Sequence, residues 1–222
     1  MTSYCIQQTG NRGNEMYWTS RIGAFCAGIG VASLSLATTK GLNQIVTPDL
    51  QPFGQLSLSF QMQHSFLGNP IQNQYELGVS KQFEIAAFQG FRPGEAVLNS
   101  ELGLIQRKDV LLSCGFLSWN TRGGVPQPFI EGGYNRGITR YMAGVQRIGT
   151  RNQAILGVGY QTTPSLLLQA DYLGGKSNFI TLGFTYNVTP SITFNPAIYR
   201  ANAGGHTMYP YMVLTWTVTA WK

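Results

Sequence analysis

Polar and apolar residues alternate with a period of two from Pro52 almost to the end of the chain. Successive side chains of a β-strand point to opposite faces, so this alternation, interrupted by turn residues, predicts short strands. No stretch has the spacing of an amphipathic helix of useful length. The predicted strands are 54–64, 72–80, 82–91, 97–106, 109–119, 127–135, 138–148, 152–161, 165–173, 177–187, 190–200 and 209–221.

The connections between these strands alternate between two kinds. Tight connections fall at 81, 107–109, 136–137, 163–164 and 189–190, and longer ones at 65–71, 92–96, 120–126, 149–151, 174–176 and 201–208. A transmembrane strand takes about 9–11 residues, which leaves about three to five residues per connection. The pattern predicts an all-β fold, a closed antiparallel up-and-down transmembrane β-barrel of about 12 strands (10–12). An even number of strands brings both ends of the barrel to the rim with the tight turns.

The alternation also predicts which face of the barrel meets lipid. In the strand 177–187, Ile180, Leu182 and Phe184 share one face, while Thr181 and Thr185 share the other. A soluble barrel would turn the apolar face inward, but about eight strands already enclose a cavity that side chains can fill. Twelve strands with an apolar lumen would leave a large void. We therefore expect the apolar face to meet hydrocarbon and the polar face to meet water. One residue fits poorly: Pro196 lies inside a predicted strand, which indicates a bulge or a shorter strand.

The first 37 residues have the features of an export signal. A polar region ends at Arg21, an apolar stretch covers 22–36, and Ser35 and Ala37 provide the small residues of a cleavage site. We therefore divide the chain into a predicted signal peptide (1–37), an N-terminal segment (38–53) and the transmembrane barrel (54–222). The segment 38–53 has little periodicity. It is expected either to lie in the periplasm or to line the lumen as a small plug.

Composition agrees with a membrane barrel and argues against several other classes. Charged residues make up 11% of the chain, against about 25% in typical soluble domains. The net charge is +6, but the basic residues are scattered at the ends of segments, so no nucleic-acid site is predicted. With Cys5 and Cys26 in the signal region, Cys114 remains alone and is expected to pack as a small apolar residue.

The chain resembles single-chain bacterial outer-membrane β-barrel proteins of the porin-like kind, over roughly residues 41–221. The resemblance is carried by GLNQIVTPDLQPFGQLSLSFQ, by the hairpin YELGVSKQFEIAAFQGF and by the final strand YMVLTWTVTAW. That last strand is similar to the aromatic-ended strand that the barrel-assembly machinery recognises, although Lys222 follows the aromatic. The resemblance implies a location in the bacterial outer membrane, in contact with the lipid bilayer and lipopolysaccharide. It identifies no ligand.

Five of the nine acidic residues fall on the face assigned to the lumen, about three to six residues from a tight turn, and Arg140 lies at a similar height. At about 3.3 Å per residue they would form a layer roughly 10 Å deep. Because carboxylate rings favour cations in pores, the layer indicates a cation-preferring constriction. A hydrogen-bonded network with Arg140 that closes the barrel is the alternative. The lumen-facing acidic layer consists of Glu76, Glu84, Glu101, Glu131 and Asp171.

Other chemistry finds little support in the sequence. His64 and His206 lie near each other only if the last strand closes on the first, and two histidines without a carboxylate do not make a metal site. The pair His64-Ser65 is similar to the serine and histidine of an outer-membrane phospholipase, but no orienting partner is evident. Phosphate-binding, dinucleotide and zinc motifs are absent from the sequence. We therefore predict no enzyme, no cofactor and no metal.

Two functions remain. The polar inner face predicts a passive pore or transporter for small polar solutes or cations. The alternative is a structural or interaction barrel with a closed lumen, acting in an envelope complex. Conductance would distinguish them.

Overall fold

The computed structural model describes residues 41–91, 94–121 and 123–221. The predicted signal peptide lies outside these residues and stays a prediction. Among the described residues, no helix is long and apolar enough to cross a membrane.

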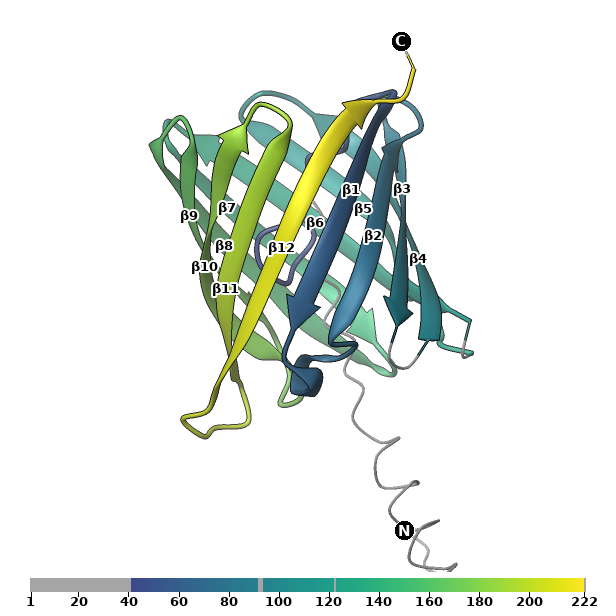
Figure 1. Ribbon diagram of the computed structural model, residues 1–222, viewed down its shortest axis with the longest axis vertical. Helices are drawn as coiled ribbons and strands as arrows, with labels where there is room; N and C mark the ends of the chain where they lie inside the picture. Colours follow the sequence, from purple (N-terminus) through teal and green to yellow (C-terminus); the bar gives the residue numbers. More distant parts are fainter. Residues whose placement is uncertain (1–40, 92–93, 122, 222) are drawn as a thin grey trace, which may run out of the picture. The chain divides into compact units, whose positions relative to one another are not determined.

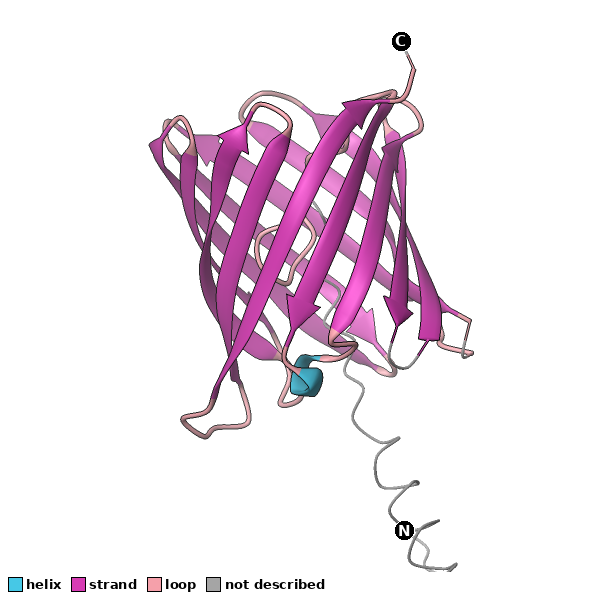
Figure 2. Cartoon of the chain, viewed as in Figure 1, coloured by secondary structure: helices cyan, strands magenta, loops and turns pink. Residues whose placement is uncertain are grey.

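Twelve antiparallel strands close into one barrel, in which each strand pairs with its neighbours in the sequence and β1 pairs with β12 (Figures 1 and 2). Each predicted strand is present, with ends that differ by a few residues at most. The strands are β1 (Gln55–Gln63), β2 (Ile71–Gly78), β3 (Phe83–Phe91), β4 (Gly94–Gln106), β5 (Val110–Asn120), β6 (Gln127–Arg136), β7 (Thr139–Ile148), β8 (Arg151–Thr163), β9 (Leu166–Leu173), β10 (Phe179–Thr189), β11 (Ile192–Ala201) and β12 (Met208–Thr219).

The two rims differ, although not at every connection that the sequence predicted. The short β2–β3, β4–β5, β6–β7, β8–β9 and β10–β11 connections share one rim with the start of β1 and the end of β12 (Figure 1). We call this the tight-turn rim. The opposite end, the loop rim, carries four longer connections, at 64–70, 121–126, 174–178 and 202–207, the first of which includes the one-turn 3-10 helix η1 (Ser65–Leu67). The longer connections predicted at 92–96 and 149–151 were wrong, because β4 already begins at Gly94 and only residues 149–150 join β7 to β8. The predicted even-stranded topology is therefore confirmed.

Large apolar side chains cover the outside of the barrel. Leu182 and Trp216 are more than half exposed, and Phe60, Ile130 and Leu156 are nearly so, each on the outward face of a different strand. Exposed apolar surface on this scale is costly in water but suits hydrocarbon. The outer face is thus the lipid-facing surface of a transmembrane barrel.

The bulge predicted at Pro196 was wrong. Strand β11 runs through this residue, which pairs with Met212 of β12. Toward β10 the pairing is interrupted between Gly183–Ala197 and Tyr186–Phe194, but the register is the same on both sides. Proline lacks the N–H that a ladder requires. Next to it, the side-chain amide of Asn195 donates a hydrogen bond of 2.7 Å to the carbonyl oxygen of Phe184 in β10. A side-chain bond thus joins the two strands here, and no bulge is needed.

The inside of the barrel is not uniformly polar, which corrects the expectation of a water-lined lumen. Toward the tight-turn rim the inner face carries hydroxyl and amide groups, such as the Ser59–Thr215 pair at 2.7 Å. Toward the loop rim, where Gln72 and Gln146 are buried polar residues, many other inward-facing positions are apolar. They form a hydrophobic core that includes Phe88, Val97, Leu117, Phe129, Met142, Ile155 and Leu173.

Candidate functional site: the occupied lumen

Residues 41–52, here called the plug, lie inside the barrel and occupy its lumen. Figure 1 shows this stretch as a loop of chain within the cylinder. Residues 42–48 are all buried. The plug is bonded to opposite sides of the wall, because Asn43 reaches β9 and β10, whereas Gln51 reaches β1 and β3. The segment is therefore part of the interior of the barrel.

Three apolar side chains anchor the first half of the plug. Leu42, Ile45 and Val46 are at most 4% exposed and belong to the hydrophobic core of the loop-rim half. The wall makes room for two of them at Gly157 of β8, where a Cβ atom would lie 2.6 Å from Leu42 and 2.8 Å from Ile45. Burial of each such side chain contributes roughly 1.5–3 kcal/mol. The plug thus supplies the filling that the apolar part of the wall requires.

Asn43 and its neighbour fix the same half by hydrogen bonds. The Asp171 carboxylate accepts the backbone N–H of Asn43 at 2.7 Å and that of Gln44 at 3.3 Å. The Asn43 side-chain amide donates to Thr181 at 2.9 Å. The backbone carbonyl oxygen of Asn43 accepts from the Tyr199 hydroxyl. Because buried polar groups are costly without partners, these bonds define one position for the segment.

The second half of the plug is held nearer the tight-turn rim. Asp49 forms an ion pair with Arg140 of β7, at 3.1 Å between Oδ1 and Nη1. Gln106 donates to the carbonyl oxygen of Pro48 at 2.7 Å. The Gln51 N–H donates to the Glu84 carboxylate, and its side-chain amide donates to Ser57 at 2.8 Å.

Gly78, at the end of β2, lets the plug backbone approach the wall closely. A Cβ atom at this position would lie 2.1 Å from the carbonyl oxygen of Pro52 and 2.5 Å from that of Gln51. Such distances are not accessible to a real side chain. The path of the chain between plug and β1 therefore depends on a residue without a side chain here.

All five acids of the predicted layer are buried on the inner face, with 1–6% exposure. Glu84 and Glu101 are direct cross-strand neighbours, and Asp171 lies on β9, where it binds the plug. Glu131 of β6 is 1% exposed, and neither of its carboxylate oxygens has a hydrogen-bond partner among the described residues. The predicted basic partner, Arg140, pairs with Asp49, which the sequence had not assigned to a site.

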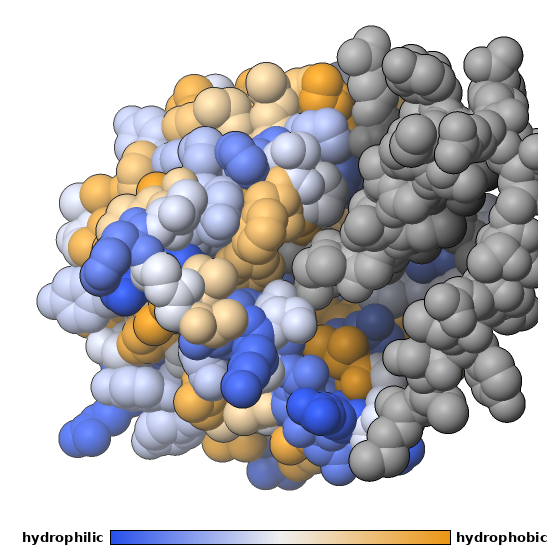
Figure 3. All heavy atoms as spheres, turned by 90° about the horizontal axis from the view of Figure 1, so that it is seen from below, coloured by the Kyte–Doolittle hydropathy of each residue, from blue (hydrophilic) through white to orange (hydrophobic). Residues whose placement is uncertain are grey.

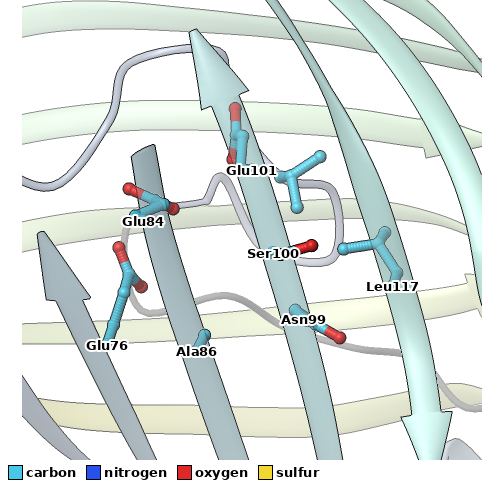
Figure 4. A pocket seen from close by; sticks show the side chains of 8 residues that line it. Glu76, Glu84, Ala86, Asn99, Ser100, Glu101 and Leu117 are labelled. Atoms are coloured by element: carbon cyan, nitrogen blue, oxygen red, sulfur yellow. The ribbon is translucent and has the colours of Figure 1, made fainter. Parts of the chain in front are cut away.

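The structure brings three of these acids around one small cavity. Glu76, Glu84 and Glu101 extend from the successive strands β2, β3 and β4 toward a shared space, which Val46 of the plug also lines (Figure 4). The cavity has a volume of about 10 Å³, the lower limit for one water molecule. Within the described ranges, no group of three histidine, cysteine or acidic side chains is placed to hold a metal ion.

A second, aromatic cluster lies inside the loop rim. Leu67 of η1 is fully buried and packs with Phe179, Tyr199 and Tyr211, whose side chains also face inward. Phe66 stacks on Tyr209 with their ring centroids 4.5 Å apart. Seen from this end, the visible surface is a mixture of polar and apolar side chains (Figure 3). The helix η1 thus extends the packed interior beside β10, β11 and β12.

The sequence contained a signal for the plug that the strand pattern alone did not reveal. Four of the acids on the inner face share their strand with an apolar inward-facing residue, which lies two or four residues closer to the loop rim than the acid does. The pairs are Glu84 with Phe88, Glu101 with Val97, Glu131 with Phe129 and Asp171 with Leu173. An inner face that changes from acidic to apolar needs an apolar filling, and LNQIV at 42–46 provides it.

A closed antiparallel barrel with an apolar exterior and both ends on the tight-turn rim defines the class of protein: a transmembrane β-barrel with the fold of bacterial outer-membrane porins. This agrees with the predicted outer-membrane location. The sequence matches no protein-family model and no curated protein.

The likeness to solved structures is one of fold. A KdgM porin in complex with disordered oligogalacturonate matches with a TM-score of 0.55 and 10% identity, over 73% of this chain and 98% of that one. A NanC porin in a rhombohedral crystal form matches with a TM-score of 0.50 and 6% identity, over 74% and 98%. Porins of known structure therefore share the barrel of this chain, while its residues differ.

Proposed function

We propose that this protein is an outer-membrane channel for small polar solutes or cations, and that residues 41–52 close it. The observation that carries the proposal is that the obstruction is a separate segment of the chain. It sits against a wall that includes glycine, hydroxyl, amide and carboxylate groups. Twelve strands enclose more space than the eight of side-chain-filled barrels, so removal of the plug would leave a passage.

The likeness to KdgM and NanC supports a passive pore, because the barrels called porins share this fold. No catalytic role is proposed. Contact with the lipid bilayer and lipopolysaccharide, and recognition of the last strand by the barrel-assembly machinery, remain part of the proposal.

The test is conductance in planar lipid bilayers. The full barrel should be closed for most of the recording time, whereas a variant that lacks residues 42–50 should conduct steadily. Correct folding of both proteins can be checked by the mobility difference between heated and unheated samples on a gel. A folded deletion variant that never conducts would refute the channel.

A second candidate is favoured by one specific observation. The loop-rim half of the lumen is packed, and the acidic cavity beside the plug holds about 10 Å³. A permanently filled barrel would serve as a structural or interaction subunit of an envelope complex. The same deletion variant separates the two functions, because a permanently closed barrel would unfold or remain non-conducting without the plug.

A further inference from the structure

The wall groups that hold the plug indicate which kind of ligand the lumen can bind. At both ends of the plug, a wall carboxylate accepts N–H groups: Asp171 binds Asn43 and Gln44, and Glu84 binds Gln51. Backbone N–H groups are neutral donors, so they make charge-assisted hydrogen bonds to a carboxylate but leave its negative charge uncompensated. An ammonium group would donate to the same carboxylates and would also balance their charge, which a buried acid requires.

Glu131 is a further inner-face carboxylate, and the plug gives it no hydrogen-bond donor. Its side chain is 1% exposed and has no hydrogen-bond partner in the part of the chain that the structure describes. The charges that act on it most are those of Glu101, Asp49 and Asp171, all of the same sign. A buried carboxylate among other carboxylates is unfavourable without a cation. The plug leaves this group without a donor.

The balance of charge on the inner face is acidic. The layer contributes five carboxylates and the plug contributes Asp49, whereas Arg140 is the basic side chain that the described strands direct inward. The remaining described lysine and arginine side chains are exposed. Anionic solutes would therefore be repelled by the same layer that attracts cations.

We propose that the acidic layer is a binding site for small organic cations with several amino groups, and that the plug and the solute compete for it. The inference rests on the proposed channel function. The acids lie on β2, β3, β4, β6 and β9, so a flexible molecule with separated ammonium groups can reach several of them. Although Glu76, Glu84 and Glu101 line one cavity, no three histidine, cysteine or acidic side chains of the described residues are placed to hold a single metal ion.

The experiment uses the variant without residues 42–50 in planar bilayers, with spermidine as the probe. In a KCl gradient, the reversal potential should show preference for K⁺ over Cl⁻, and micromolar to millimolar spermidine should interrupt the current. Glu131→Gln combined with Asp171→Asn should weaken the block about tenfold, since two carboxylate partners are lost. Asp109→Asn, an exposed acid at the tight-turn rim, is the matched control and should leave the block unchanged.

A synthetic peptide of residues 41–52 provides the competition arm. It should close the deletion variant, and spermidine should raise the peptide concentration needed to do so. A variant that conducts but prefers Cl⁻, or that spermidine does not block, would overturn this inference and leave the channel standing. A folded variant without any conductance would instead overturn the channel itself.

Discussion

The equilibrium between bound and released plug can be shifted by weakening the apolar anchor of the plug, while the barrel wall is left unchanged. Replacing Leu42 and Ile45 together by serine removes two side chains that are at most 4% exposed. Each contributes roughly 1.5–3 kcal/mol by burial, so the bound plug of the double variant is about 3–6 kcal/mol less stable relative to the released plug than that of the parent. Since about 1.4 kcal/mol is a factor of ten, the ratio of bound to released plug should fall at least a hundredfold.

The assay is labelling of a cysteine introduced at Thr47, which is 2% exposed, by a membrane-impermeant maleimide. Cys114 is replaced by serine in all samples. Labelling should be slow in the parent and much faster in the Leu42→Ser, Ile45→Ser variant, with an increase in the fraction of time that the channel is open. Leu50→Ser, at a half-buried position of the same segment, is the matched control. Equal labelling rates in all three proteins would show that the apolar anchor does not hold the plug.

Three further perturbations test other contacts. Gly78→Ala places a Cβ atom 2.1 Å from a plug carbonyl oxygen, so it should speed the same cysteine labelling, whereas Gly94→Ala, with nothing within 4 Å, should not; equal effects would exclude the close approach as the cause. Asp49→Asn breaks a partly exposed ion pair, whose side chains are 28% and 36% exposed, and such pairs contribute up to about 1 kcal/mol. Labelling should thus rise only a few-fold, and less so at high salt; an effect as large as that of the anchor variant would contradict this ranking. Finally, brominated lipids should quench the fluorescence of Trp119 and Trp216, which are 60% and 54% exposed. Unquenched fluorescence in a folded, inserted barrel would refute their contact with lipid.

The barrel was predictable because its determinants are local. Alternation sets which side chains of one strand share a face, and a turn between two strands sets their pairing, so residues such as Leu182 and Thr181 reveal their faces within a few positions. The acids were also assigned to the inner face by this rule. The strand ends shifted by a few residues because the connection residues that flank them can pair or not pair without changing the pattern.

The sequence left open whether residues 38–53 lie in the periplasm or line the lumen as a plug, because strand alternation does not decide between the two. The contact between Asn43 and Asp171 joins residues 128 positions apart, and no periodicity in the segment 38–53 indicates it. Arg140 was expected to pair with acids of the layer. Its ion pair is instead with Asp49, because the plug brings that residue to the wall. Contacts of this kind depend on which segment fills the space, and period-two alternation describes only the wall.

The plug is tethered to β1 through residues 53 and 54, and this connection sets how strongly a solute must bind. A tethered segment acts at an effective concentration of order millimolar, so the occupied state is favoured even when the contacts are modest. If plug and solute share the acidic layer, the apparent affinity for spermidine equals the intrinsic affinity multiplied by the fraction of barrels with the plug released. The Leu42→Ser, Ile45→Ser variant should then bind spermidine more tightly than the parent, by at least about a hundredfold unless nearly all plugs are already released before that gain is reached. The deletion variant should bind at least as tightly. The same spermidine affinity in all three proteins would show that the plug does not occupy the solute site, even if each of them conducts.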